Sequence, residues 1–412
     1  APMESGGIEG PFRGAPLRAA VLCCLFMVVQ GVDTYGISYV APLLGADFGI
    51  APAQIGMLFA VSVMASLVGA TVLAPLSDRY GRRRVLLATV LLTGAPSIFI
   101  PLTRDMTVLL ALRVIVGLGF GAALPVALAL VSDLVPARFR ARLVTLTTTS
   151  IVVGMSLSGI AASTIVPRMG WQFLLFASGT TCIVSVLLGL WLLPESRPSG
   201  AGASGANAAP AANWRALLEP GTLLRSALFC LVLATSYMVL NFAVYWLPTV
   251  ILNEGYSFSD AGFIGSTRQL VTVGVSFFVG FLMDRFGGGR VLLACQATAM
   301  VLLLATSGLA SFAALSLGVL LSGMSVLSAS VSGLLALVSG SYPAPVRATA
   351  LGWVLGTSRV AGGSVGTYMG GVALGAGWTQ QQLATAAGLA AAAGLTALVA
   401  AVSLGRRDQR KV

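Results

Sequence analysis

Long apolar runs fill most of this chain and are separated by short polar segments. Hydrophobic residues make up 57% of its 412 residues and charged residues only 9%, whereas about a quarter of a soluble domain is charged. Several runs reach the roughly 20 residues that an α-helix needs to cross a bilayer. The sequence therefore predicts a helical protein that crosses a membrane many times, and it excludes an ordinary soluble domain.

The apolar runs predict twelve membrane spans with a break after the sixth. The residues at the break, 194–221, are rich in Pro, Gly, Ala and Ser, a composition typical of a flexible tether. We therefore expect an all-α membrane protein with a six-helix half at 1–193, a cytoplasmic linker at 194–221 and a second six-helix half at 222–412. The expected spans are 17–44, 55–76, 85–101, 106–131, 142–167, 171–193, 223–251, 261–283, 290–309, 313–339, 348–372 and 383–404.

The two expected halves repeat each other in sequence. The loop Ala74–Val85, APLSDRYGRRRV, matches Gly280–Val291, GFLMDRFGGGRV, at an offset of 206 residues. At an offset of 207, Ser132–Ala141 matches Ser339–Ala348, and Gly170-Trp171 matches Gly377-Trp378. An offset that spans an even number of helices predicts a parallel repeat whose axis lies along the membrane normal, as in the halves of many transporters.

Basic residues indicate the orientation of the chain. Of its 24 Lys and Arg, only Arg104 and Arg168 fall on the expected outer side, apart from three within spans. This is the positive-inside pattern, so the net charge of +11 reports topology and does not indicate nucleic-acid binding. We expect a multi-pass protein of the bacterial inner membrane with both termini in the cytoplasm; the bacterial source rests only on the rarity of lysine.

Four ionisable residues lie deep within the expected spans, where a charge is costly unless it faces a partner or a wet cavity. They are Asp33, Arg113, Arg268 and Arg359. The excess of arginine favours an anionic ligand, because a guanidinium group matches the geometry of a carboxylate. An alternative is that Asp33 and Arg113 form a fixed structural pair. The chain has no histidine, so Asp33 is the group that could take up and release a proton.

Aromatic and amide side chains occur at a similar depth. We include them as candidates for contact with a planar substrate: Tyr35, Tyr39, Tyr237, Asn241, Trp246 and Trp353. Such side chains can form a stacking wall, but aromatic residues in membrane helices often serve packing or the interface. Both interpretations stay open.

These motifs resemble the major facilitator superfamily over nearly the whole chain. The loop APLSDRYGRRRV resembles its signature between spans 2 and 3, with Ala74 in place of the usual glycine, and RVIVGLGFGAALP from Arg113 resembles a second signature. Within the superfamily, QGVDTYGISYVAPLL in span 1, YWLPTVILNEGYS at the end of span 7 and GTSRVAGGSVG in span 11 resemble the aromatic acid:proton symporters. Span 5 lacks the Gly-Pro pair that is typical of antiporters, which favours symport.

The resemblance implies roles for the matching residues. Asp33 matches an acid implicated in proton coupling, and Arg113 and Arg359 match arginines tied to substrate or coupling. Asp78 matches an acid that latches an inner gate, and the other gating candidates are Arg82, Asp133, Arg140 and Asp284. One departure matters: Gln30 stands where the family's DGxD pattern has its first acid, and glutamine cannot carry a proton.

The sequence thus predicts a transporter, not an enzyme, that takes up a benzoate-type carboxylate with a proton by alternating access, with substrate bound at mid-membrane between the halves. The main alternative is a carrier of a dicarboxylate or nicotinate-like anion, by uniport or exchange because of Gln30. Export of a lipophilic compound and ligand sensing without transport are weaker alternatives. We expect no cofactor other than the coupling proton, and as partners a small organic anion and the bilayer, in a protein that functions as a monomer.

Overall fold

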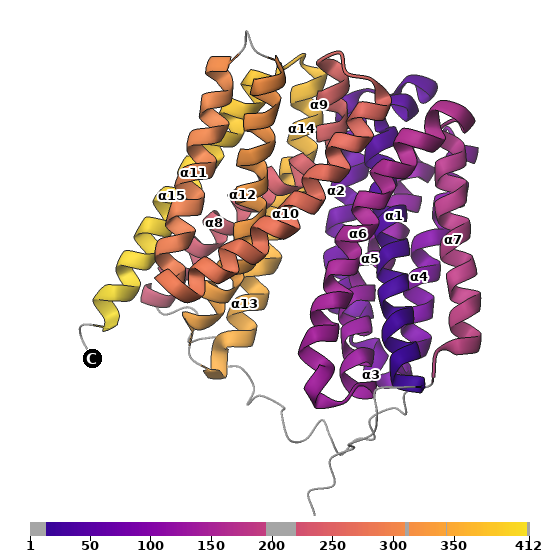
Figure 1. Ribbon diagram of the computed structural model, residues 1–412, viewed down its shortest axis with the longest axis horizontal. Helices are drawn as coiled ribbons and strands as arrows, with labels where there is room; N and C mark the ends of the chain where they lie inside the picture. Colours follow the sequence, from indigo (N-terminus) through magenta and orange to yellow (C-terminus); the bar gives the residue numbers. More distant parts are fainter. Residues whose placement is uncertain (1–13, 195–219, 310–312, 343, 410–412) are drawn as a thin grey trace, which may run out of the picture. The chain divides into compact units, whose positions relative to one another are not determined.

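A computed structural model describes residues 14–194, 220–309, 313–342 and 344–409. These residues form helices and the turns between them, with no strand (Figure 1). Eleven of the helices are long and apolar enough to cross a membrane. The prediction of an all-α, multi-pass membrane protein is therefore confirmed. Most of the predicted linker lies outside the described residues.

Contacts divide the chain into two compact units. Unit 1 takes residues 1–36, 65–158 and 172–203, and unit 2 takes 37–64, 159–171 and 204–412. The boundary cuts α1 (Ala15–Phe48), α2 (Pro52–Val68) and α6 (Ala137–Met169) and separates the first residue of α7 (Trp171–Leu192) from the rest, so unit 2 combines parts of these helices with the C-terminal helices. This grouping follows contacts, whereas the predicted halves follow the sequence repeat, and the domain limits at 193 and 222 stay a prediction.

The first half of the sequence forms helices whose bounds agree with the expected spans to within several residues. The short helix α3 lies within the charged loop after the second span, and η1 is a π-helical continuation of α2. The elements are α1 (Ala15–Phe48), α2 (Pro52–Val68), η1 (Gly69–Leu73), α3 (Leu76–Tyr80), α4 (Arg82–Phe99), η2 (Ile100–Leu102), α5 (Met106–Leu134), α6 (Ala137–Met169) and α7 (Trp171–Leu192).

The second half repeats this arrangement with two extra breaks. The expected seventh span is divided into α8 and the short α9 at Trp246, and the expected eleventh span is divided by a π-helical segment, η5. The elements are α8 (Pro220–Tyr245), α9 (Leu247–Asn253), α10 (Phe258–Phe286), α11 (Gly288–Ala305), η4 (Thr306–Leu309), α12 (Ala313–Gly340), α13 (Ala344–Ser358), η5 (Arg359–Ser364), α14 (Val365–Gly375) and α15 (Gln380–Gln409).

The backbone supports the repeat at matched glycines. Gly81 and Gly287 both end a helix with a left-handed φ, of 95° and 89°. Gly170 and Gly377, the second matched pair, have φ of 84° and 78°. Glycine adopts this conformation without a steric penalty. The repeated sequence therefore builds the same turns in both halves.

Glycines also allow helices within each unit to approach closely. A Cβ atom on Gly362 of η5 would lie 1.9 Å from the carbonyl oxygen of Ala234 in α8. In unit 1, a Cβ atom on Gly69 of η1 would lie 2.1 Å from the carbonyl oxygen of Leu118 in α5. Small residues commonly form such contacts between membrane helices. The two π-helical segments thus lie where backbones touch.

Candidate transport site

Asp33 lies at the centre of a polar cluster in unit 1. Its side chain is completely buried in α1. Oδ2 accepts a 2.7 Å hydrogen bond from the Ser97 hydroxyl of α4, and Oδ1 accepts a 2.8 Å bond from the Ser178 hydroxyl of α7. Arg113 of α5, itself 1% exposed, is close enough to Asp33 to interact electrostatically. Helices α4 and α7 therefore each supply a hydrogen-bond donor to one buried carboxyl group of α1.

Gln30 lies one turn before Asp33 and forms a separate contact. Its side-chain nitrogen donates a 3.2 Å bond to the Thr93 hydroxyl, which donates in turn to the carbonyl oxygen of Thr89. The glutamine thus fixes α1 against α4. Tyr35, which follows Asp33 in the sequence of α1, packs edge-on against Phe120, with ring centroids 5.6 Å apart.

The predicted gating residues are only partly brought together. In unit 1, Arg82 bonds the Asp133 carboxylate, contacts Asp78 at 3.4 Å and donates a 2.7 Å bond to the carbonyl oxygen of Ala129. This links α4 to the end of α5. Arg140 and Asp284 are exposed, and their roles stay a prediction.

Arg268 is the buried cation of unit 2. Its side chain is 4% exposed on α10, and Nη2 donates a 2.5 Å bond to Oε1 of the neighbouring Gln269. Tyr39 of α1 lies close enough to interact electrostatically with Arg268 and bonds to Ser266. This places two of the predicted substrate residues, Tyr39 and Arg268, beside each other.

Arg359 forms a second group in unit 2. Its guanidinium carbon lies 5.7 Å from the centroid of the Tyr237 ring in α8, a cation–π distance. Asn241, one turn further along α8, donates a 2.9 Å bond to the carbonyl oxygen of Tyr237. Because Arg359 begins the π-helical segment η5, its position depends on that irregular turn.

Trp246 lies in an aromatic cluster. It is 1% exposed, its indole nitrogen donates a 2.8 Å bond to the carbonyl oxygen of Thr367, and Phe59 of α2 meets it edge-on at 5.4 Å. Phe59 also stacks on Tyr245 at 4.8 Å. In this structure Trp246 therefore packs against protein on these sides. Trp353 differs from it, because its side chain is 54% exposed on α13.

Sequence reasoning missed the partners of the predicted residues. Ser97 and Ser178 hold Asp33, and Phe59 packs on Trp246, but none was selected. A signal existed for α4: Thr89, Thr93 and Ser97 recur every four residues in an apolar span and so share one helix face. Ser178 and Phe59 had no comparable pattern.

Comparison with known proteins identifies the family. Residues 22–367 match the Major Facilitator Superfamily. The chain is 32% identical to the 4-hydroxybenzoate transporter PcaK of Pseudomonas aeruginosa, over 93% of this chain and 91% of that protein. It is 29% identical to a gallate transporter of Pseudomonas putida, over 92% and 90%. A D-xylose–proton symporter crystal structure, at 16% identity, superposes with a TM-score of 0.72 over 95% and 97% of the chains.

The chain therefore belongs to the Major Facilitator Superfamily, a family of membrane transporters and not of enzymes. The resemblance read from the sequence motifs is confirmed at both levels, since these relatives carry the names of aromatic acid transporters. The helical fold with its internal repeat is the fold of this family.

Proposed function

We propose that the protein takes up a small aromatic carboxylate of the hydroxybenzoate type together with a proton, by alternating access. The substrate class is supported by the named activities of relatives that match along about nine-tenths of the chain. Proton coupling is supported by one observation: among the described residues, Asp33 is the one carboxyl group that is buried.

Asp33 suits a coupling role because its environment serves both protonation states. When ionised, it accepts bonds from Ser97 and Ser178 and is attracted to Arg113. When protonated, it loses a charge that is costly to hold within the membrane. Gln30 cannot carry a proton, so in this mechanism Asp33 acts as the sole proton carrier.

The substrate carboxylate is assigned to the arginines of the C-terminal half. Arg359 and Arg268 each lie beside a tyrosine, Tyr237 and Tyr39 respectively. A guanidinium group beside an aromatic ring offers a donor for the carboxylate and a face for the substrate ring. We place the protein in the bacterial cytoplasmic membrane with both termini inside, and we propose that the monomer is the working unit.

The test is uptake of labelled 4-hydroxybenzoate into liposomes that contain the purified protein, with and without an acidic exterior. Weak aromatic acids cross bilayers unaided when protonated, so empty liposomes and Arg359→Ala protein are the controls. Uptake that exceeds both controls and rises with the gradient supports proton symport. Substrate exchange that does not depend on the pH gradient would show that the protein is an exchanger and not a symporter. If the folded protein takes up no 4-hydroxybenzoate, the assignment to aromatic acids is wrong.

The same assay separates the alternative substrate class. Unlabelled benzoates, aliphatic dicarboxylates and nicotinate are added as competitors. Competition by benzoates alone supports the proposal. Stronger competition by dicarboxylates or nicotinate would shift the assignment to a carrier of those anions.

A further inference from the structure

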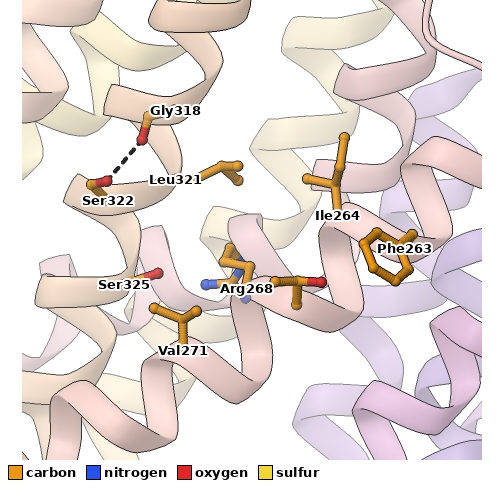
Figure 2. A pocket seen from close by; sticks show the side chains of 9 residues that line it. Phe263, Ile264, Arg268, Val271, Gly318, Leu321, Ser322 and Ser325 are labelled. Atoms are coloured by element: carbon orange, nitrogen blue, oxygen red, sulfur yellow. Dashed lines mark hydrogen bonds between the residues drawn. The ribbon is translucent and has the colours of Figure 1, made fainter.

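A cavity of about 360 Å³ lies between α10 and α12 within unit 2 (Figure 2). Arg268 and Ser325 form its buried part, with the guanidinium group directed from α10 toward α12. The hydroxyl groups of Thr267 and Ser322 add to the polar lining, and the rest is mainly apolar. No Asp or Glu is among the residues that line it. Its size falls within the range of small-molecule sites.

Arg268 has bonding capacity that the described residues leave unused. Nη2 bonds Gln269, whereas Nε and Nη1 are buried and have no hydrogen-bond partner in the described part of the chain. A buried cation whose donors lack partners is unfavourable, and an anion that binds beside it removes that penalty. The lining therefore favours a ligand that carries one negative group.

The mouth of the cavity lies on an apolar, exposed face of the unit. Phe263 and Val271, which border it on α10, are 65% and 51% exposed. Further along the same helix, Leu270, Phe278 and Phe281 are also exposed. These exposed residues recur at helical spacing, so they form one apolar face of α10. A different face of α10, with Gly262 and Ser266, packs against Gly159.

The position of Arg268 along α10 places the cavity well away from the start of the helix. Arg268 lies ten residues after the start of α10 at Phe258, which is about 15 Å along the helix axis. That is about half the thickness of a hydrocarbon core. Arg268 therefore lies well inside the apolar span Phe258–Phe286, where a charged group is costly without a partner.

We infer that this cavity is a lateral binding site for a small amphiphilic carboxylic acid, reached from the bilayer side of the helix bundle. Its carboxyl group pairs with Arg268, its apolar body lies among Phe263, Ile264 and Leu321, and Ser322 and Ser325 can bond a ring hydroxyl. The ligand class rests on the proposed function, whereas the location rests on the cavity and on the unused donors of Arg268.

The experiment is photolabelling of the full-length protein in phosphatidylcholine nanodiscs with 4-azidobenzoate, followed by mass spectrometry of the peptides. We expect labels on peptides of α10 and α12 that excess 4-hydroxybenzoate removes. The neutral methyl ester of the probe should label these peptides without depending on Arg268, which controls for non-specific reaction from the lipid phase.

Two variants test the location against a matched control. Gly318 lies at the mouth, and a Cβ atom added there meets nothing within 4 Å, so Gly318→Phe should fold and block the entrance. Gly274 on α10 is equally open but lies outside the lining, so Gly274→Phe is the control. Labelling should fall about tenfold in Gly318→Phe and Arg268→Gln, and it should be unchanged in Gly274→Phe.

The outcomes distinguish this inference from the proposed function. Labelling elsewhere, or labelling that Gly318→Phe leaves intact, would overturn the cavity site even if uptake of 4-hydroxybenzoate is normal. Specific labelling of the cavity without any uptake would keep the site and reject the transport proposal. Loss of labelling on addition of phosphatidylglycerol would show that an anionic lipid is the occupant, and would overturn the assignment to a small acid.

Discussion

The hydroxyl group of Ser178 donates a 2.8 Å hydrogen bond to Oδ1 of Asp33 and so connects α7 to α1 inside unit 1. The second carboxylate oxygen is held by Ser97 of α4. A buried carboxylate with both oxygens bonded is fixed in position, and hydrogen bonds to a charged group are stronger than those between neutral groups. Any movement of α1 relative to α4 or α7 changes these bonds, and with them the ability of Asp33 to hold a charge.

The first prediction concerns Asp33→Asn. An amide has nearly the same shape and can keep bonds to Ser97 and Ser178, but it cannot take up a proton. We expect uptake driven by an acidic exterior to fall at least about tenfold, while exchange of substrate across the membrane persists. Initial rates of uptake and of counterflow in proteoliposomes measure the two.

The matched control for that variant is Asp105→Asn. Asp105 is the N-cap of α5, where it accepts a 2.7 Å bond from the Thr107 backbone, and asparagine is an equally good cap. Both activities should match the wild type. If Asp33→Asn also responds normally to the gradient, Asp33 is not the coupling group.

The second prediction concerns Arg359 and Tyr237. Their contact depends on a charge above a ring, so Tyr237→Phe keeps it and Tyr237→Leu removes it. Arg359→Lys keeps the charge but loses the planar fork that matches a carboxylate. We expect KM for 4-hydroxybenzoate to rise about tenfold or more in Arg359→Lys and Tyr237→Leu, and to stay near wild type in Tyr237→Phe. An equal loss in Tyr237→Phe would point to the hydroxyl group instead of the ring.

The sequence predicted the buried charges better than their surroundings. Asp33 and Arg268 could be selected because a charge within an apolar run needs an explanation. Their partners come from helices far apart in the chain: Ser178 lies 145 residues from Asp33. Serine is common in membrane helices and carries no pattern of its own. Such partners follow from helix packing, which one sequence does not reveal.

Trp246 also shows that one sequence does not reveal how helices pack. Its depth and type were compatible with contact with substrate and with helix packing, and the structure places it against Phe59 and Thr367. The helix break between α8 and α9 at this residue was absent from the expected continuous span 223–251. A tryptophan in an apolar run gives the same sequence pattern whether it lines a binding site or packs between helices.

The third prediction compares the two acids beside Arg82. Asp133 has 34% of its side chain exposed and Asp78 has 71%, and Asp133 is the closer of the two. Exposed ion pairs contribute about 0–1 kcal/mol, so Asp78→Asn should scarcely change the midpoint of thermal unfolding in detergent. Asp133→Asn should lower it measurably, because Asp133 is closer to Arg82 and less exposed than Asp78. A larger effect of Asp78→Asn would contradict this ranking.

The fourth prediction uses two glycines of α10 with opposite surroundings. A Cβ atom on Gly262 would lie 2.5 Å from the carbonyl oxygen of Gly159 and 2.8 Å from Cβ of Ser163, whereas one on Gly274 would meet nothing within 4 Å. Gly262→Ala should therefore destabilise the protein by about 1–3 kcal/mol through overpacking. Gly274→Ala should stabilise it by about 0.5–1 kcal/mol, because alanine favours the helix. Thermal unfolding of both variants measures the sign of each change in stability. If both changes have the same sign, the close contact of α6 and α10 is not maintained.

The fifth prediction concerns the hydrogen bond from Trp246 to the carbonyl oxygen of Thr367. Trp246→Phe keeps an aromatic ring beside Phe59 but loses the indole hydrogen bond to a carbonyl of α14, and a hydrogen bond contributes about 0.5–1.5 kcal/mol. The matched variant is Trp353→Phe, because Trp353 is 54% exposed and exposed substitutions usually change stability by less than about 0.5 kcal/mol. We therefore expect thermal unfolding to shift downward in Trp246→Phe and to stay nearly constant in Trp353→Phe. Equal midpoints for the two variants would mean that the bond does not stabilise the junction of α8 and α9 against α14.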